Sequence, residues 1–207
     1  MAGALNSPPW RGKIRDRRLR DAFRRVDRTQ FLDISLRPRA DDDCALPIGH
    51  GQTTSQPQVI MQMLEMMLAA ADKTPEIVLE IGAGCGYQTA ILAALCREVV
   101  AMERIGALAK QTSARLRAMG YNNVHVIHGD GLGGHAAAAP FDGVIVCAEY
   151  AAAPENLLAQ LAPAGRLVMP LSSGFGNGCR LVAFDAGGRI AARRGAVRFV
   201  PMLEGTS

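Results

Sequence analysis

Three glycines that alternate with other residues are the feature of this chain best suited to binding a small molecule. Gly82, Gly84 and Gly86 follow the apolar run Ile77–Ile81 and lead into a helical stretch. Because glycine has no Cβ atom, such a loop can adopt positive φ angles and present backbone N–H groups to a carboxylate or phosphate. The third glycine of the dinucleotide-binding pattern would fall at position 87, where the chain has Tyr87. The spacing therefore predicts a nucleotide-type cofactor and disfavours a nicotinamide or flavin dinucleotide.

Two acidic residues extend this pattern. Glu80 stands two residues before the first glycine, and Glu103 follows the next apolar stretch, Val99–Met102. The order Glu-x-Gly-x-Gly-x-Gly resembles the first motif of S-adenosylmethionine-dependent methyltransferases. A carboxylate at the carboxyl end of a second strand can accept hydrogen bonds from both hydroxyls of a ribose. We therefore expect Glu103 to bind the cofactor, and a helix N-cap is the alternative role for it.

Strands and helices alternate through most of the chain. The expected strands are residues 77–81, 99–102, 124–128, 143–147 and 166–170, and the expected helices are residues 58–70, 88–95, 107–119 and 155–161. This alternation predicts a doubly wound α/β fold with a mostly parallel, seven-stranded sheet, as in Rossmann-like methyltransferases. Residues 180–184 and 190–200 flank a Gly-Gly turn, so we expect them to form an antiparallel hairpin at the sheet edge. An amphipathic, arginine-rich helix over residues 14–26 would form an N-terminal extension.

The length of 207 residues suits one domain. Glycine, serine and proline near the N-terminus predict a flexible arm over residues 1–12. We expect a single methyltransferase domain over residues 13–207. Within it, residues 13–72 would supply the N-terminal helices and a substrate loop, and residues 73–207 would form the cofactor-binding sheet.

Composition points to a reduced, cytoplasmic protein. The five cysteines contain no C-x-x-C pair, so neither a disulfide framework nor a metal site is expected. The N-terminus lacks an apolar signal core, and no apolar run is long enough to cross a membrane. The net charge of +4 is mild and concentrated in the arginine-rich helix. Arginines on the outer face of a docked helix are commoner than an RNA-binding surface, so we expect no nucleic-acid partner, and a monomer.

A second loop, rich in glycine, proline and small hydroxyl residues, precedes the sheet. Leu46–Pro57 reads Leu-Pro-Ile-Gly-His-Gly-Gln-Thr-Thr-Ser-Gln-Pro. Together with the glycine loop, Glu103-Arg104-Ile105, Gly129-Asp130-Gly131 and Phe199-Val200-Pro201, it closely resembles the protein-L-isoaspartate O-methyltransferase family, over roughly residues 19–202. The Pro-Ile-Gly-His-Gly-Gln-Thr element is more specific than the glycine loop, which many methyltransferases share.

The resemblance implies an activity and a set of site residues. The methyl group of S-adenosylmethionine would pass to the free α-carboxylate of isoaspartyl residues in damaged peptides and proteins, leaving S-adenosylhomocysteine and starting their repair to aspartate. Ser55 would lie at the methyl-transfer centre. Asp130 would bind the adenine amino group. The cofactor-binding residues that it implies are Glu80, Gly82, Gly84, Gly86, Glu103, Arg104, Asp130 and Gly131, and the substrate-binding residues are Ile48, His50, Thr53, Ser55 and Cys147.

The chemistry of that reaction suits these residue types. A carboxylate is already ionised near neutral pH, so no general base is required. Carboxylates are weak and well-hydrated nucleophiles, so the rate should come from alignment with the methyl group and from removal of water in a closed pocket. Ser55 can orient such a carboxylate without losing its own proton.

Several of these residues have structural alternatives. His50 could be a loop histidine hydrogen-bonded to backbone, Ser55 could cap the following helix, and Asp130 could cap a turn. Cys85 and Cys147 could simply pack in the interior.

Two residues after the fourth strand depart from the family pattern. Glu149 would repel an anionic acceptor, and Tyr150 would narrow the pocket. Two alternative functions therefore stay open. One is methylation of a different carboxylate, on a modified peptide or a small metabolite, and the other is a non-catalytic or RNA-associated module.

Overall fold

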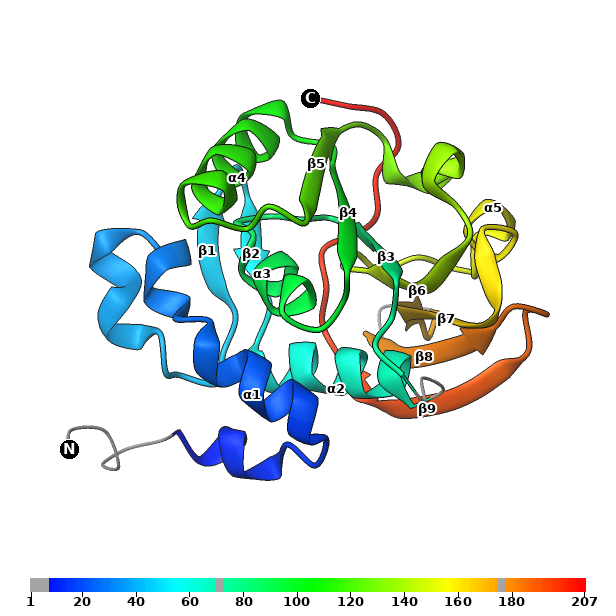
Figure 1. Ribbon diagram of the computed structural model, residues 1–207, viewed down its shortest axis with the longest axis horizontal. Coiled ribbons are helices and arrows are strands. Elements are labelled where there is room, and N and C mark those ends of the chain that lie inside the picture. The colour runs from blue at the N-terminus through cyan, green and yellow to red at the C-terminus, as the bar shows by residue number, and fades with distance from the viewer. Residues whose placement is uncertain (1–7, 70–72, 175–177) are drawn as a thin grey trace.

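The computed structural model describes residues 8–69, 73–174 and 178–207. Figure 1 shows a seven-stranded sheet flanked by helices, with a small two-stranded sheet beside it. The strands are β1 (Leu46–Gly49), β2 (Gln52–Thr54), β3 (Ile77–Ile81), β4 (Glu98–Glu103), β5 (Val124–His128), β6 (Phe141–Val146), β7 (Leu161–Ser172), β8 (Cys179–Asp185) and β9 (Ile190–Val197). The α-helices are α1 (Arg17–Arg25), α2 (Pro57–Leu68), α3 (Tyr87–Ala93), α4 (Gly106–Ala118) and α5 (Glu155–Leu158).

The order of the large sheet is β5–β4–β3–β6–β7–β8–β9. The first five strands in this order are parallel, and β8 and β9 are antiparallel additions. The chain moves outward from β3 to β5 and then returns to the other side of β3 with β6, so the strand order reverses between β3 and β6. Open α/β sheets bind ligands beyond the carboxyl ends of their strands at such a point. The expected doubly wound sheet and its C-terminal hairpin are confirmed.

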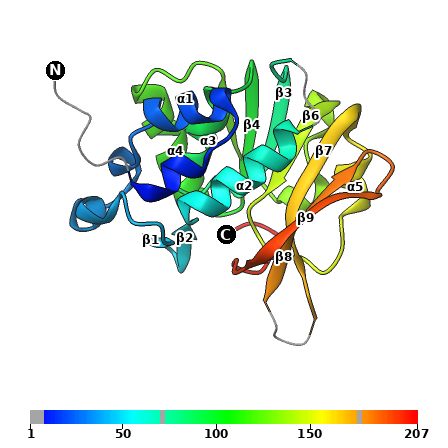
Figure 2. The ribbon, with the colours of Figure 1, turned by 90° about the horizontal axis from the view of Figure 1, so that it is seen from below.

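Alternate residues of each central strand face the two sides of the sheet. In β3, Val78 packs into a core with helices α1 to α4, whereas Leu79 and Ile81 pack into a second core with Leu157 of α5. Figures 1 and 2 show α1, α2 and α3 on one side of the sheet and α5 on the other. Nearly continuous apolar runs are what a parallel strand needs when both of its faces are covered.

The N-terminal helix is shorter than expected. It begins at Arg17 because the Asp16 carboxylate accepts hydrogen bonds from the backbone N–H groups of Arg18 and Leu19, and it ends at Arg25. Its apolar side chains are buried, and Asp21 pairs with arginines on its exposed face. The expected amphipathic character is therefore present over nine residues.

The expected flexible arm over residues 1–12 falls partly outside the described residues, which begin at position 8. From position 9 the backbone forms a 3₁₀ helix, Pro9–Lys13. The Trp10 ring is buried and packs edge-on against Phe23, with ring centroids 5.4 Å apart. Trp10, within the segment expected to be a flexible arm, therefore packs against α1.

Two further segments differ from the expectation. The loop expected up to Pro57 contains an antiparallel hairpin, β1 and β2, whose turn includes positive φ angles at Gly49, His50 and Gly51. The helix expected over residues 155–161 is the single turn of α5, because β7 already begins at Leu161. A run of apolar residues with no clear period does not distinguish a helix from a strand.

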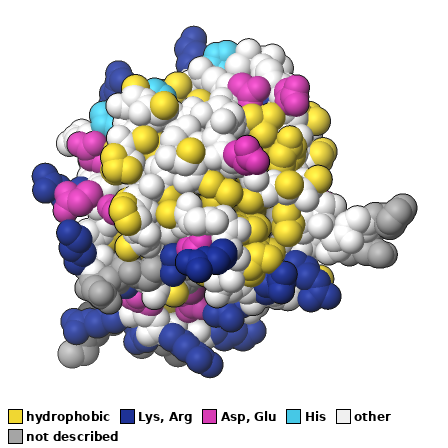
Figure 3. Space-filling model, turned by 90° about the vertical axis from the view of Figure 1, so that its right-hand side faces the viewer, with side chains coloured by type: hydrophobic (Ala, Val, Ile, Leu, Met, Phe, Trp, Pro, Cys, Tyr) yellow, Lys and Arg dark blue, Asp and Glu magenta, His cyan; other side chains and the backbone are white. Residues whose placement is uncertain are grey.

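The surface carries charge in distinct regions. In Figure 3, which shows the side of the molecule on the right of Figure 1, Lys and Arg side chains gather in the lower part of the view, and hydrophobic side chains lie across its middle. Along β9 the side chains of Arg193 and Arg194 are exposed. In the described part of the chain, no helix has both the length and the apolar character to cross a membrane.

Candidate active site

A cavity lies beyond the carboxyl ends of β3, β4 and β6, where the strand order reverses. Its open volume, which includes solvent at its mouth, is about 920 Å³. Ten of the residues expected to form the site line it: Ile48, Thr53, Ser55, Glu80, Gly82, Gly84, Glu103, Arg104, Gly131 and Cys147. The structure thus brings together residues that are spread between positions 48 and 147. It also adds Val200, Pro201, Met202 and Leu203 from the C-terminal segment.

The glycine loop adopts the conformation that its composition predicts. Gly82, Gly84 and Gly86 have φ angles of 91°, 55° and 89°, which favour glycine. A Cβ atom on Gly82 would approach the Cβ atom of Cys147 to 3.3 Å, and one on Gly84 would lie 3.1 Å from Ile48 Cδ1. Larger residues would therefore both strain this backbone and intrude on the wall of the cavity.

Gly86 has a different role from the other two glycines. It caps α3, and a Cβ atom there would lie 2.9 Å from Thr112 Cγ2 of α4. Gly86 does not line the cavity. Because Gly86 has no side chain, α3 and α4 can approach each other at this point. Gly86 therefore supports the glycine loop without lining the cavity.

Glu103 joins the end of β4 to the glycine loop. One carboxylate oxygen, Oε2, accepts a hydrogen bond from the Gly84 N–H at 2.9 Å, and the other accepts from the Ile105 N–H at 2.9 Å. Each carboxylate oxygen has a second lone pair, so the group can still bind a ligand. The N-cap of α4 is Ile105, and Glu103 is buried, so Glu103 is not the solvated N-cap considered as its alternative role. Glu103 lines the cavity, which is the position expected for a ribose ligand.

Glu80 lies at the floor of the cavity and is fully buried. Thr89 Oγ1 lies 2.5 Å from its Oε2 atom, and Gln88 Nε2 donates to Oε1 at 3.0 Å. Burial raises the pKa of Glu80 to about 8, and these two hydrogen bonds oppose the rise. Glu80 is therefore mostly protonated at neutral pH, so the floor of the cavity is polar and largely uncharged.

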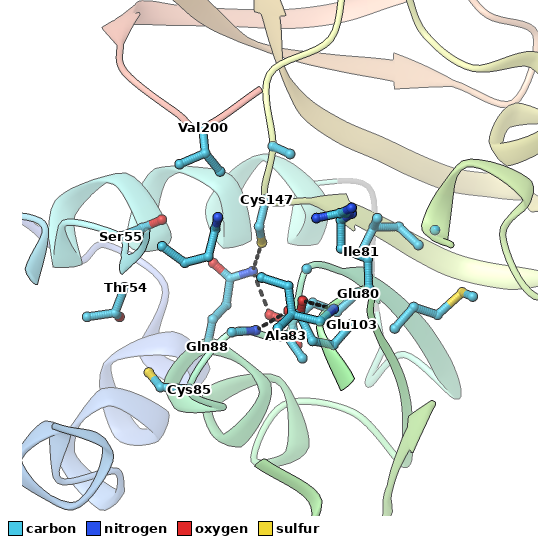
Figure 4. Close-up of a pocket in the computed structure, with 18 of the residues that line it drawn as sticks. Thr54, Ser55, Glu80, Ile81, Ala83, Cys85, Gln88, Glu103, Cys147 and Val200 are labelled. Carbon is cyan, nitrogen blue, oxygen red and sulfur yellow. Dashed lines mark hydrogen bonds between the residues drawn. The ribbon is translucent and has the colours of Figure 1, made fainter. Parts of the chain in front are cut away.

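Cys147 is connected to the same network. Gln88 Nε2 donates to Cys147 Sγ at 3.0 Å, as the dashed lines in Figure 4 show. Burial, and then the neighbouring Glu80, raise the pKa of this thiol well above its usual value. Cys147 is thus a neutral wall residue, because a reactive cysteine needs a lowered pKa. Gln88 was missed by the sequence analysis, although its place in the first turn after the glycine loop points toward the site.

Ser55 follows the β1–β2 hairpin and is partly buried at the wall of the cavity. Asp43, not Ser55, caps α2, because its carboxylate accepts from the Gln58 N–H at 2.9 Å and also from the Gln56 and Gln58 side chains. The alternative role of Ser55 as a helix cap is therefore wrong, and its hydroxyl remains available to a ligand.

A buried arginine holds the backbone around Ser55. Arg28 has only 3% of its surface exposed, and its guanidinium donates to the carbonyl oxygens of Ala40, Asp42, Cys44 and Ser55 at 2.9 to 3.2 Å. Arg28 was not predicted as a functional residue, because a buried arginine carries no local sequence signal.

The Arg28 guanidinium also stacks over the Tyr87 ring, with its carbon 5.7 Å from the ring centroid. Tyr87 packs against Phe31, is 1% exposed and is one of the residues that line the cavity. Glu149 and Tyr150, the two departures from the family pattern, line neither this cavity nor the one beside it. The Glu149 backbone pairs with the C-terminal segment, and Tyr150 pairs with Leu171.

A second, more open cavity adjoins the first. Its open volume is about 1280 Å³, and its walls come from α2, the hairpin and the end of β9. Thr53, Ser55, Cys147 and Val200 line both cavities. Figure 4 shows Ser55, Cys147 and Val200 around the same part of the first cavity. Two molecules could therefore meet at these four residues.

Two other expected site residues lie outside the first cavity. His50 occupies the exposed hairpin turn with a φ of 52°. Asp130 accepts hydrogen bonds from the Leu132 N–H at 2.9 Å and from the Gly205 N–H at 2.7 Å. The first contact is the turn cap proposed as the alternative role of Asp130, and the second ties the residue to the C-terminal segment. Among the described residues, no group of three or more His, Cys, Asp or Glu side chains is arranged to hold a metal ion.

Comparison with known proteins gives a consistent assignment. The family model for protein-L-isoaspartate(D-aspartate) O-methyltransferase matches residues 9–207. A protein-L-isoaspartate O-methyltransferase of Halorhodospira halophila is 47% identical over 193 residues, which cover 93% of this chain and 86% of that protein. One of Methylibium petroleiphilum is 42% identical over 198 residues, which cover 93% and 73% of the two chains.

A solved structure supports the fold. The crystal structure of a putative protein-L-isoaspartate O-methyltransferase from Plasmodium falciparum, in complex with S-adenosyl-L-homocysteine, superposes with a TM-score of 0.79. It covers 93% of both chains at 22% identity, so it bears on the fold alone. The family of the chain is assigned from the match to the family model and from the sequence identities with the relatives named above. This chain belongs to the protein-L-isoaspartate(D-aspartate) O-methyltransferase family of methyltransferases.

Proposed function

We propose that this chain uses S-adenosylmethionine to methylate the α-carboxylate of L-isoaspartyl residues in damaged proteins, and so begins their repair. The observation that carries the proposal is the meeting of two cavities at Thr53, Ser55, Cys147 and Val200. The first cavity has the glycine-rich wall that suits a nucleotide. The second adjoins it and is lined by residues of the hairpin, of α2 and of the end of β9. A donor in the first cavity and an acceptor in the second would meet at this shared wall.

The residues of the first cavity have complementary roles toward the cofactor. Gly82 and Gly84 bring backbone close to its methionine and ribose portions, and the Glu103 carboxylate accepts from the ribose hydroxyls. Glu80 and Arg104 form the floor and the side of the same cavity. The positive φ angles and the close walls behind the two glycines support this fit.

The adenine end of the cofactor lies near the loop after β5. Gly131 lines the cavity there, and Asp130 stands beside it. The Asp130 carboxylate keeps free lone pairs while it holds Leu132 and Gly205, so it can also accept from the adenine amino group. Gly86 contributes by allowing α3 to begin close to α4.

The acceptor site is formed by the β1–β2 hairpin and the shared wall. Ile48, Thr53 and Cys147 surround the point where the isoaspartyl carboxylate meets the donor, and Ser55 orients it. His50, in the exposed turn, contacts the polypeptide outside the cavity. Among the described residues that line the second cavity, Arg198 is the one with a charged side chain, which favours an anionic acceptor.

The rate of methyl transfer comes from aligning the acceptor carboxylate with the methyl group and from removing its water. Bound S-adenosylmethionine supplies an electrophilic methyl group on a sulfonium centre. The acceptor carboxylate needs no proton removed, so the site requires no general base. The Ser55 hydroxyl donates a hydrogen bond that fixes one carboxylate oxygen, and the apolar Ile48 and Val200 side chains exclude water from the other.

The test is methyl transfer from radiolabelled S-adenosylmethionine to two peptides that differ only in an isoaspartyl or an aspartyl linkage. We expect label in the isoaspartyl peptide alone, released as methanol by mild base, because the product is a carboxyl methyl ester. Label that resists base would exclude any carboxyl acceptor. A base-labile product on small carboxylates, with none on the isoaspartyl peptide, would favour the alternative substrate class.

We further propose that residues 13–207 fold as one domain and act as a monomer in the cytoplasm, without a nucleic-acid partner. One apolar core joins α1 and α2 to the large sheet. All five cysteines are free thiols, which suits a reducing compartment. Arginines of α1 pair with Asp16 and Asp21. Sedimentation of the purified chain, with and without RNA, tests these expectations.

A further inference from the structure

Arginines gather on the β8–β9 hairpin with little acidic counterpart. Between residues 173 and 200 the sequence contains five arginines, and Asp185 is its only acidic residue. Arg189 pairs with Asp185 at 3.2 Å. The other four are exposed, and in the described part of the chain their side chains form no hydrogen bond or ion pair. We call these four residues the hairpin arginines: Arg180, Arg193, Arg194 and Arg198.

The hairpin arginines border the second cavity, which we assign to the acceptor. Arg198 lines that cavity directly, and Arg194 precedes Gly195, the first residue of β9 that lines it. Arg180 lies across the β8–β9 ladder from Ala196, another lining residue. Figure 3 shows Lys and Arg side chains gathered in the lower part of the view, at the height at which Figure 1 places β9. Positive charge therefore extends from the cavity onto the hairpin.

Strand β9 is an edge of the large sheet, so one side of its backbone pairs with β8 and the other pairs with no described strand. Residues paired across a ladder face the same side of a sheet. Val182 packs into the core that contains α5, so its partner Arg193, and Arg180 two positions earlier in β8, lie on that face. Arg198 lies on the opposite face, because it lines the cavity beside α2. The free edge of β9 thus has positive charge on both faces.

A polypeptide that enters the second cavity meets this edge. The unpaired backbone groups of an edge strand can pair with an extended chain. Guanidinium groups bind carboxylates through two parallel hydrogen bonds, and those of the hairpin arginines have no partner of their own. The side chains that such a surface recognises are those of aspartate and glutamate.

We propose that the hairpin arginines bind acidic side chains that flank the isoaspartyl residue, so that acidic segments of damaged proteins are the preferred acceptors. This inference rests on the proposed function and narrows its substrate class. Opposite charges speed the encounter and hold the polypeptide in place, whereas the reacting carboxylate and Ser55 are unchanged. The preference should therefore lower the KM and leave kcat nearly constant.

Charged side chains on an edge strand also have a common structural role. They keep the strand from pairing with another molecule, and the register shift between Arg193 and Ala196 places a bulge there that has the same effect. That role requires charge but no particular acceptor. It predicts that variants aggregate and that acidic and neutral peptides have equal KM values, so the two roles are separable.

The experiment measures methyl transfer to three isoaspartyl peptides of equal length, in which the residues flanking the isoaspartyl residue are glutamate, glutamine or lysine. Glutamine matches glutamate in size and carries no charge. For the wild type we expect the KM to be lowest with glutamate and highest with lysine. The glutamate and glutamine peptides should differ by at least about fivefold, because several exposed charge pairs act together. Raising the salt from about 0.05 M to about 0.5 M should remove most of this difference.

Two double variants test whether the effect belongs to the hairpin. Arg194→Gln combined with Arg198→Gln should reduce the difference between the glutamate and glutamine peptides to about twofold or less, and leave the KM of the glutamine peptide unchanged. The matched control, Arg25→Gln combined with Arg117→Gln, removes the same charge from exposed positions on α1 and α4 and should keep the wild-type preference. Binding of S-adenosylhomocysteine reports whether each variant is folded.

Each possible outcome decides a different claim. Equal KM values for the glutamate and glutamine peptides in the wild type would overturn this role of the arginines while leaving the proposed function intact. A preference that persists in the hairpin double variant would overturn it too. Salt-dependent RNA binding that this variant abolishes, with no change in any peptide KM, would assign the arginines to nucleic acid instead. A wild-type chain that methylates none of the three peptides would contradict the proposed function itself, and this inference with it.

Discussion

At the scale of single residues, Ser55 is the most direct test of the acceptor site. Ser55→Ala removes the hydroxyl at the wall shared by the two cavities, while Asp43, which caps α2, is unaffected. We expect turnover with an isoaspartyl peptide to fall by about 10²-fold, which is the order of a lost orienting contact. Affinity for S-adenosylhomocysteine should change little. Equal turnover in the variant and the wild type would remove Ser55 from the site.

Glu103 should show the opposite pattern. Glu103→Ala removes the carboxylate proposed to hold the ribose and also frees the Gly84 and Ile105 N–H groups. We expect S-adenosylhomocysteine affinity, measured by calorimetry, to fall by at least about tenfold, because hydrogen bonds to a carboxylate are among the stronger ones. Glu98→Ala, at the exposed start of the same strand, is the control. Unchanged affinity would contradict the ribose role.

Glu80 makes stability depend on pH. Below its ordinary pKa of 4.5 the group is protonated in both the folded and the unfolded chain. Between that pH and about 8 the unfolded chain ionises while burial keeps the folded group protonated, so stability is lost as pH rises through this window. We expect the melting temperature of Glu80→Gln, relative to the wild type, to rise by a few degrees between pH 5 and pH 8. A difference that does not vary with pH would show that Glu80 is ionised when buried.

At the scale of elements, the β1–β2 hairpin and the loop before it depend on Arg28. Arg28→Met leaves four carbonyl oxygens without their donor, including that of Ser55. We expect a loss of about 2–4 kcal/mol in unfolding free energy, the usual range for a broken buried network. The KM for an isoaspartyl peptide should also rise, because the hairpin lines the acceptor side of the site.

Two control variants accompany Arg28→Met: one keeps a positive charge at position 28, and the other removes a different arginine. Arg28→Lys keeps the charge but not the planar fork that reaches several carbonyls, so it should recover only part of the loss. Arg25→Met removes an exposed arginine from the end of α1 and should leave both stability and KM unchanged. Loss of stability in Arg28→Met without any change in peptide KM would make Arg28 a purely structural residue.

Elements with a strong local signal were predictable. The strand β3 is a short, largely apolar run, and the glycine loop requires backbone that glycine alone adopts readily, so β3 and its loop follow from the sequence. The 14–26 helix is shorter because Asp16 caps it at Arg17, and this choice of cap depends on the path of the preceding chain. The β1–β2 hairpin was missed because its three- and four-residue strands are too short to show an alternation.

At the scale of the whole molecule, the unpredicted features are those that join distant parts of the chain. The Asp130–Gly205 contact spans 75 positions, and the Arg28–Ser55 contact spans 27. No local pattern encodes such pairs, because each partner has a common alternative role near its own position. Asp130 also caps a turn, and most arginines are exposed. The sequence therefore predicted the sheet, the cofactor class and ten cavity-lining residues. It did not predict that the C-terminal segment lines the same cavity.

The central claim is that a donor and an acceptor meet at the wall shared by the two cavities. A crystal structure of the chain with S-adenosylhomocysteine and an isoaspartyl peptide tests this most directly. We predict the nucleoside beside Gly82, Gly84 and Glu103, with the peptide in the second cavity and its free α-carboxylate hydrogen-bonded to Ser55. A carboxylate bound away from Ser55, or a nucleoside outside the first cavity, would contradict the account.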